Sequence, residues 1–222
     1  MVRKGTTLKV KILETAHLFF SEKGYDKTSV NDIIKKLGIS KGAFYHYYKS
    51  KDEVLDDIIM DYTTEVVEML YEIAYDSSLN GLEKYKKMFT ETESRRKKNA
   101  IRFSFLTRFF LNEENLLFRH RYTEKILELT KPPFIHILQQ GVKEGLFIIN
   151  DPEETAELIM RLGNMYRTKI AILNLSLKDH PNNLLKIQNI IEFSQDTVEK
   201  LLGLDSGVLN FISGSFQNRI KP

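Results

Sequence analysis

The 222-residue chain contains no cysteine and no tryptophan. The lack of cysteine excludes disulfide frameworks, cysteine-based zinc sites, iron–sulfur clusters and cysteine nucleophiles. Long hydrophobic runs are also missing: no stretch approaches the ~20 apolar residues that a membrane helix needs, and none follows the basic start of the chain. We therefore expect a soluble, cytoplasmic protein with no membrane partner.

Motifs for metal binding and catalysis are missing as well. The five histidines include no pair at three- or four-residue spacing, and there is no HExxH motif, so no metal site is predicted. The sequence has no Gly-x-Ser-x-Gly elbow and no glycine-rich phosphate loop. We therefore predict no cofactor, no catalytic residues and no enzymatic activity. The alternative, an all-α enzyme, would need a polar catalytic cluster that the sequence does not show.

Charge is distributed unevenly along the chain. Residues 1–51 hold eleven Lys/Arg and four Asp/Glu, a formal charge of +7, whereas the remaining residues carry −4. A basic first quarter on a mildly acidic body suggests a module that meets a polyanion. Charge alone favours a solvated basic face, so the residue pattern has to decide between the two.

Helical periodicity dominates that pattern. Apolar residues recur at steps of three and four along most of the chain, and strand alternation of useful length is missing, so the fold class is predicted as all-α. A first helix is expected from Leu8 to Gly24. A second is expected between an N-cap at Thr28 and a stop at Gly38, and a third from Ser40.

Capping signals and prolines divide the rest of the chain. Pro132 and Pro133 are predicted to interrupt or restart a helix, because each lacks an amide donor. The starts of the later helices are predicted from capping boxes at Ser50–Glu53 and Asn80–Glu83, a cap at Asn112, and Asp151 followed by Pro152. The last major helix is predicted over 182–202, with Gly203 as its end.

The stretch 28–51 carries the functional pattern. A helix of about nine residues, a tight turn at Gly38 and a second short helix form a helix-turn-helix pattern. Phe44, Tyr47 and Tyr48 are spaced to pack on the preceding helices. The residues left facing outward are small or hydrogen-bonding, as a DNA major groove requires. They are Ser40, Lys41, Gly42, Ala43, Tyr45 and His46.

Residues 28–55, TSVNDIIKKLGISKGAFYHYYKSKDEVL, together with FFSEKGY at 19–25, resemble the signature of TetR-type (tetracycline-repressor-like) transcriptional regulators. The close resemblance covers residues 8–55; the rest matches only in helix pattern and length. It implies an N-terminal three-helix helix-turn-helix DNA-binding domain at 1–51. It further implies a larger C-terminal helical ligand-binding and dimerisation domain at 52–203, followed by a tail at 204–222 whose structure the sequence does not predict.

The resemblance also implies roles for individual residues. Thr28 and Lys51 would contact phosphates, and Tyr45 and His46 would bond the DNA backbone. Ser40, Lys41, Gly42 and Ala43 would lie at or in the DNA major groove, where Lys41 would contact a base or bind a phosphate. The implied partner is double-stranded DNA with a palindromic operator, bound by a homodimer. Ala43 stands where the family often has threonine, so the operator sequence cannot be copied from relatives.

An effector pocket in the C-terminal domain is a further implication of the resemblance. The aromatic-rich middle of the chain favours an apolar or aromatic small molecule, because such sites are mainly apolar with few polar groups. Core packing is the better explanation for most of these aromatic residues. The candidate pocket residues are Phe105, Arg108, Phe109, His136, Asn164 and Tyr166.

Narrow apolar stripes on the last two helices suit packing within the domain or across a dimer. By resemblance, these helices would form a four-helix interface with a second subunit. The candidate interface residues are Ile159, Leu162, Tyr166, Leu173, Ile187, Ile191 and Val198.

The sequence therefore favours a sequence-specific DNA-binding transcriptional regulator, in this family most often a repressor, that a small-molecule effector releases from its operator. The alternative from another class is a protein–protein adaptor that uses the helix-turn-helix as a helical docking surface. The two differ in one property, since DNA binding by a regulator should weaken steeply with salt.

Overall fold

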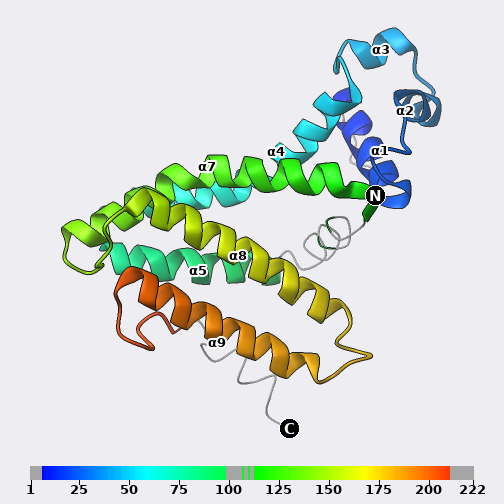
Figure 1. Ribbon diagram of the computed structural model, residues 1–222. Helices are drawn as coiled ribbons and strands as arrows, with labels where there is room; N and C mark the ends of the chain where they lie inside the picture. The colour runs from blue at the N-terminus through cyan, green and yellow to red at the C-terminus, as the bar shows by residue number, and fades with distance from the viewer. Residues whose placement is uncertain (1–6, 99–106, 108–109, 111–112, 211–222) are drawn as a thin grey trace. The chain divides into compact units, whose positions relative to one another are not determined.

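The structure is a computed structural model that describes residues 7–98, 107, 110 and 113–210. Within those residues every regular element is helical, which confirms the predicted all-α class (Figure 1). The same residues contain no helix long and apolar enough to cross a membrane. The elements are α1 (Leu8–Lys23), α2 (Val30–Leu37), α3 (Lys41–Tyr45), α4 (Lys51–Ala74), α5 (Gly81–Lys98), the 3₁₀ helix η1 (Glu113–Asn115), α7 (Leu116–Lys143), α8 (Pro152–Leu175) and α9 (Asn183–Leu202).

The chain forms two compact units that are interleaved in sequence. Unit 1 consists of Met1–Glu65 and Ile101–Ile126, and unit 2 consists of Val66–Ala100 and Leu127–Pro222. Helices α4 and α7 each begin in unit 1 and end in unit 2. These units are defined by contacts. The domain ranges 1–51, 52–203 and 204–222 were drawn from expected function and stay predictions.

Most helix ends follow the predicted capping signals. Gly38 adopts a left-handed conformation (φ 64°) and Gly203 does the same after α9 (φ 67°). Asn80 and Glu83 exchange two hydrogen bonds of 2.9 Å between side chain and backbone, which confirms that capping box. Asp151 accepts bonds of 3.0 Å from the amides of two residues in the first turn of α8.

The cap predicted for α2 was wrong by one residue. Ser29, not Thr28, is the N-cap: its hydroxyl accepts from the Asp32 amide, while the Asp32 carboxylate accepts from the Ser29 amide. Thr28 is buried instead, and its hydroxyl donates 2.8 Å to the carbonyl oxygen of Gly24. Serine and threonine have similar capping preferences, so the adjacent pair left the choice to tertiary packing.

The interruption predicted at Pro132 and Pro133 was also wrong, because both lie inside the continuous helix α7. Each proline removes one amide donor from the helix, but the hydrogen bonds of the neighbouring turns remain. Pro133 is buried and is followed by the core residue Phe134, so packing holds this stretch helical. At the predicted cap of α4, the Ser50 hydroxyl accepts from the Glu53 amide, and the Glu53 carboxylate accepts from the Lys49 amide. The predicted cap Asn112 lies outside the described residues.

Each unit has its own hydrophobic core. In unit 1, α1, α2, α3 and the first part of α4 share a core with Phe118 near the start of α7. Its fully buried members include Ile12, Phe20, Ile33, Phe44, Leu55 and Phe118. The core of unit 1 therefore includes Phe118, which lies more than fifty positions after Tyr62, the last residue of α4 in that core.

Unit 2 packs the later part of α4, α5, most of α7, α8 and α9 around a second core that includes Ile137, Leu138 and Leu202. Helices α8 and α9 lie side by side and antiparallel (Figure 1). The chain after α9 is held by the buried carboxylate of Glu199, which accepts from the amides of Gly207 at 3.0 Å and Leu209 at 2.8 Å. Residues 204–210 of the predicted tail thus pack on unit 2; residues 211–222 lie outside the described part.

Candidate nucleic-acid interface

Helices α2 and α3 form the helix-turn-helix expected from the sequence. After α2, the amide of Gly38 bonds back to the carbonyls of Ile34 and Lys35, which ends the helix. The left-handed glycine then turns the chain towards Ser40, whose hydroxyl accepts from the Ala43 amide at 3.1 Å and caps α3. These two local features orient α3 against α2.

The structure brings the predicted contact residues of α3 together on an exposed surface. Lys41, Gly42, Tyr45 and His46 are exposed, as is the cap residue Ser40, while Ala43 is half-buried. Tyr45 is 52% exposed even though it is aromatic, and its ring meets the edge of the buried Phe44 ring at 5.4 Å. An exposed aromatic hydroxyl beside a lysine and a glycine is a surface of the type that DNA contacts use.

The buried side of α3 is smaller than predicted. Phe44 and Tyr48 lie in the core of unit 1, as expected from their spacing. Tyr47 was expected there too, but it is 38% exposed and its ring packs on His46 at 4.9 Å. The short α3 ends at Tyr45, so Tyr47 follows a turn, and helical spacing no longer applies to it.

Gly42 has no packing reason to be glycine. A Cβ atom at this position would meet nothing closer than the Ser40 hydroxyl at 3.9 Å, and the backbone is in the ordinary helical region. Glycine in a helix costs roughly 1 kcal/mol relative to alanine. The absence of a side chain therefore leaves this part of α3 open to close approach by another molecule.

Several lysines of unit 1 differ in whether they form ion pairs. Lys9, Lys23 and Lys27 pair with carboxylates at 2.8–2.9 Å: Lys9 with Asp57, Lys23 with Asp32 and Lys27 with Glu114. Four exposed lysines of α2, α3 and the turn after them form no ion pair with any residue that the structure describes. They are Lys35, Lys36, Lys41 and Lys49. Exposed positive charge is therefore present on the helix-turn-helix, and Lys11 of α1 is exposed as well.

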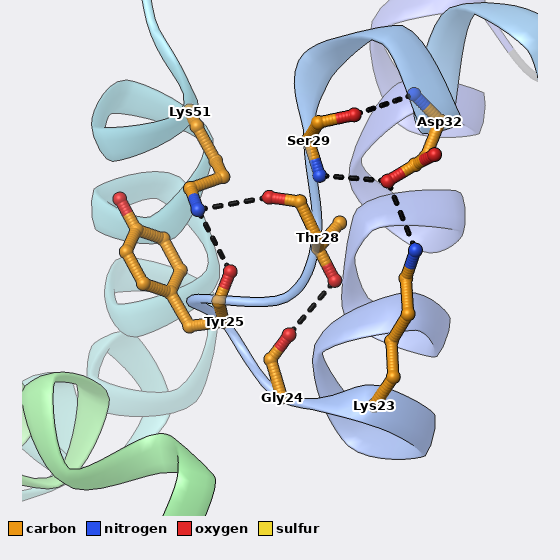
Figure 2. A network of polar contacts seen from close by, with 7 residues as sticks. All are labelled: Lys23, Gly24, Tyr25, Thr28, Ser29, Asp32 and Lys51. Carbon is orange, nitrogen blue, oxygen red and sulfur yellow. Dashed lines mark hydrogen bonds and ion pairs between the residues drawn. The ribbon is translucent and has the colours of Figure 1, made fainter.

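Thr28 and Lys51, both predicted to contact phosphate, meet at the turn between α1 and α2 (Figure 2). The Lys51 ammonium donates to the carbonyl oxygens of Tyr25 at 2.7 Å and Thr28 at 2.8 Å, and it lies 3.9 Å from the centroid of the Tyr25 ring. Partial burial lowers the pKa of Lys51. Both side chains therefore hold this turn, and their contacts with phosphate stay a prediction.

The capping box of α2 is also charged. The Asp32 carboxylate accepts from the Ser29 amide at 2.8 Å and from the Lys23 ammonium at 2.9 Å (Figure 2). These bonds, first among them the one from the Ser29 backbone, hold the pKa of Asp32 well below its usual range. A negative charge at the N-terminus of a helix is favourable, so α2 starts at a defined residue.

One buried polar residue of unit 1 escaped the sequence reasoning. Asn115 in η1 is fully buried; its side-chain oxygen accepts from the Tyr25 amide at 3.0 Å, and its nitrogen donates to the Phe20 carbonyl at 3.1 Å. No local pattern marks this residue, because its partners lie 90 and 95 positions earlier in the chain. Only covariation among homologues or a structure could reveal such a pair.

Three of the six candidate pocket residues, Phe105, Arg108 and Phe109, lie outside the described residues. The other three, His136, Asn164 and Tyr166, are half-buried in unit 2. His136 stacks on the exposed Tyr75 at 4.5 Å, and Tyr166 meets the Phe193 ring at 6.3 Å. The pocket assignment therefore stays a prediction.

The candidate dimer residues divide into two groups. Ile159, Ile187 and Val198 are already buried within the single chain, at 7% exposure or less. The remaining four, Leu162, Tyr166, Leu173 and Ile191, are half-buried on α8 and α9. Their role in a dimer stays a prediction too.

A helix-turn-helix with an unpaired basic, small-residue surface defines the class of this protein as a DNA-binding regulator. Comparison with known proteins supports this class. Residues 12–58 match the family model described as "Bacterial regulatory proteins, tetR family". Among curated proteins, the chain is 29% identical over 142 residues to the uncharacterised HTH-type transcriptional regulator YfiR of Bacillus subtilis, covering 63% of this chain and 67% of the relative.

A second relative is the HTH-type transcriptional repressor KstR2 of Mycobacterium tuberculosis, 26% identical over 155 residues, covering 68% of this chain and 73% of the relative. Among solved structures, the one described as the SmeT-Triclosan complex superposes with a TM-score of 0.63 at 15% identity, covering 90% of this chain and 93% of the other, which shows a shared fold. Residues 12–58 thus match the DNA-binding domain of the TetR family of bacterial regulatory proteins.

Proposed function

We propose that this protein is a homodimeric transcriptional repressor that binds a palindromic DNA operator through α3 and is released from it by a small-molecule effector. The observation that carries the DNA-binding part is the exposed surface of α3, where Lys41, Gly42 and Tyr45 stand beside lysines without ion-pair partners in the described structure. KstR2, which shares sequence over most of its length, is named a repressor.

The homodimer is supported by exposed apolar side chains in unit 2. On α8, Leu158, Met165 and Ile172 recur every seven residues and are 46–53% exposed. On α9, the apolar side chains of Leu185 and Phe193 are 62% and 60% exposed. Exposed apolar side chains that gather into one patch mark a protein interface, and we propose that these residues form one. In a dimer, two copies of α3 at 34–36 Å spacing would enter successive major grooves.

The proposed effector is a small molecule. A structural neighbour with the same fold is described in complex with triclosan, an aromatic small molecule. An effector would act by population shift: it binds more tightly to a conformation that does not match the operator, and DNA affinity falls by that difference in binding free energy. We propose an apolar or aromatic effector bound in unit 2.

Selection of sheared genomic DNA on the purified protein, at low and at high salt, tests the operator. We expect enrichment of a short inverted repeat that is lost as salt rises. The slope of log affinity against log salt concentration should be about −0.9 for each phosphate that the protein neutralises. The control is the same selection with a Lys41→Ala, Tyr45→Ala double variant, which should enrich no repeat. Diffuse enrichment by wild-type protein, including protein refolded free of ligand, would favour the adaptor alternative.

A further inference from the structure

The turn between α1 and α2, residues 24–29, precedes the helix-turn-helix. One backbone bond closes it, from the Thr28 amide to the Tyr25 carbonyl at 3.1 Å, and side chains from outside the turn also hold it. Both backbone groups of Tyr25 are used: the amide donates to Asn115 and the carbonyl accepts from Lys51. Lys51 belongs to α4, which follows the helix-turn-helix directly. Asn115 belongs to η1, far along the sequence, so it is a second and independent support of the turn.

Several contacts place residues 113–121 against this turn and against α4. A Cβ atom on Gly24 would lie 2.5 Å from the Glu114 Cβ atom, so the turn and η1 touch at backbone distance. Glu114 also pairs with Lys27 at 2.8 Å, and Arg121 pairs with Asp52 at 2.8 Å. Asn115 is the buried member of this set.

Among these residues, Asn115 is the one whose removal should disturb the turn most. Its side chain is fully buried, and its oxygen accepts the hydrogen bond of the Tyr25 amide. No other acceptor for this amide is found among the described residues. The Phe20 carbonyl is less dependent, because it also accepts from the Gly24 amide at 3.1 Å. Removal of Asn115 would leave the buried amide of Tyr25, the second residue of the turn, unpaired.

We propose that Asn115 is a positioning residue for operator binding, which fixes the turn at residues 24–29 and thereby the start of α2. This inference rests on the proposed function. Asn115 does not touch DNA in this account; it raises the fraction of molecules in which α2 and α3 are correctly placed. Apparent operator affinity is proportional to that fraction.

The first test measures operator affinity and amide hydrogen exchange of residues 20–29 in an Asn115→Ala variant. Exchange should rise in residues 20–29, and affinity should fall by roughly threefold to a hundredfold. The matched control is Asn183→Ala, which removes another buried asparagine, one that donates to the Ser176 hydroxyl in unit 2. That variant should leave both readings unchanged.

Asn115→Leu separates the lost hydrogen bonds from the lost side-chain volume, because it fills the space but offers no acceptor for the Tyr25 amide. It should weaken operator binding to a similar degree as Asn115→Ala. Equal operator affinity of Asn115→Ala and wild type, or unchanged exchange in residues 20–29, would overturn the inference.

A second test needs only wild-type protein and covers the case in which the alanine variant does not fold. Because coupling is reciprocal, operator DNA should slow exchange in residues 113–118 as well as in residues 20–29. No protection of residues 113–118 by bound operator would also overturn the inference. A wild-type protein that binds no operator would instead refute the proposed function, and the exchange comparison without DNA would still test the role of Asn115.

Discussion

The ammonium group of Lys51 lies 3.9 Å from the centroid of the Tyr25 ring and donates a 2.7 Å hydrogen bond to the carbonyl oxygen of the same residue. The first residue of α4 therefore stabilises the turn that precedes α2. One side chain thus ties the turn between α1 and α2 to the start of α4.

Replacing Lys51 by methionine tests both roles of this residue. Lys51→Met keeps the apolar stem but leaves the Tyr25 and Thr28 carbonyls without their charged donor, so the free energy of unfolding should fall by about 1–2 kcal/mol. If Lys51 also contacts a phosphate, the salt slope of DNA binding should fall by about 0.9. Urea unfolding and affinity measurements at four salt concentrations check these values. An unchanged slope would leave Lys51 only its role in the turn.

Truncation of the exposed side chains of α3 should weaken operator binding. We expect Lys41→Ala and Tyr45→Ala each to cost about 1–3 kcal/mol of binding free energy. The folded state should be unaffected, because both side chains are exposed. Fluorescence anisotropy with the selected operator measures the effect, and Lys143→Ala, an exposed lysine of unit 2, controls for loss of charge. Equal affinity of Tyr45→Ala and wild type would remove this residue from the interface.

Gly42 should tolerate a side chain in the free protein but not on DNA. Gly42→Gln replaces a poor helix former by a good one at a position with open space around it, so thermal stability should stay equal or rise. The long side chain would block close approach, and operator affinity should fall at least about tenfold, a cost near 1.4 kcal/mol. Gly42→Ala serves as the intermediate case. Tight operator binding by Gly42→Gln would place this part of α3 away from the groove.

A charge in the exposed apolar stripe of α8 should prevent dimer formation. Met165 and Ile172 are 52% and 53% exposed in the single chain, so Met165→Glu and Ile172→Glu should fold normally. In a dimer these side chains would be desolvated, and the carboxylates would be unpaired. Sedimentation velocity should show monomers for both variants and dimers for wild type and for the control Ile148→Glu, whose side chain is 78% exposed. Dimeric Met165→Glu protein would place the interface elsewhere.

The acid stability of α2 should depend on Asp32. Its pKa is lowered in the folded state by the Ser29 amide and by Lys23, so its contribution to stability is complete above the unfolded-state pKa near 4. The contribution is lost as pH falls from there through the lower folded-state pKa. The difference in urea midpoint between wild type and Asp32→Asn should therefore be largest at pH 7 and shrink at pH 3. A difference independent of pH would mean that charge is not involved.

The fold class and most helix ends were predictable from local sequence signals. Gly38 and Asp151 act through their own backbone neighbours, so spacing alone located the ends that they define. Thr28 and Ser29 are both good caps, and the choice between them depends on burial of Thr28 against the rest of unit 1. Pro132 and Pro133 defeat the local rule for the same reason, because packing around Phe134 outweighs two missing amides.

The candidate site was predictable where it is local and not where it is assembled. The exposed residues of α3 follow from helix spacing and from the turn at Gly38. Tyr47 was misplaced because α3 ends earlier than its sequence indicates. Asn115 could not be found from the sequence, since hydrogen bonds to Tyr25 and Phe20 across ninety residues leave no periodic signal.

The interleaving of the two units has a consequence for synthesis of the chain. Phe118 and Asn115 complete the interior of unit 1, yet residues 66–100, which belong to unit 2, are made before them. During synthesis, the core of unit 1 therefore cannot be completed until more than fifty residues after the first segment of the unit have been made. A nascent chain stopped at residue 65 should remain protease-sensitive, and resistance should appear only once residue 126 has left the exit tunnel.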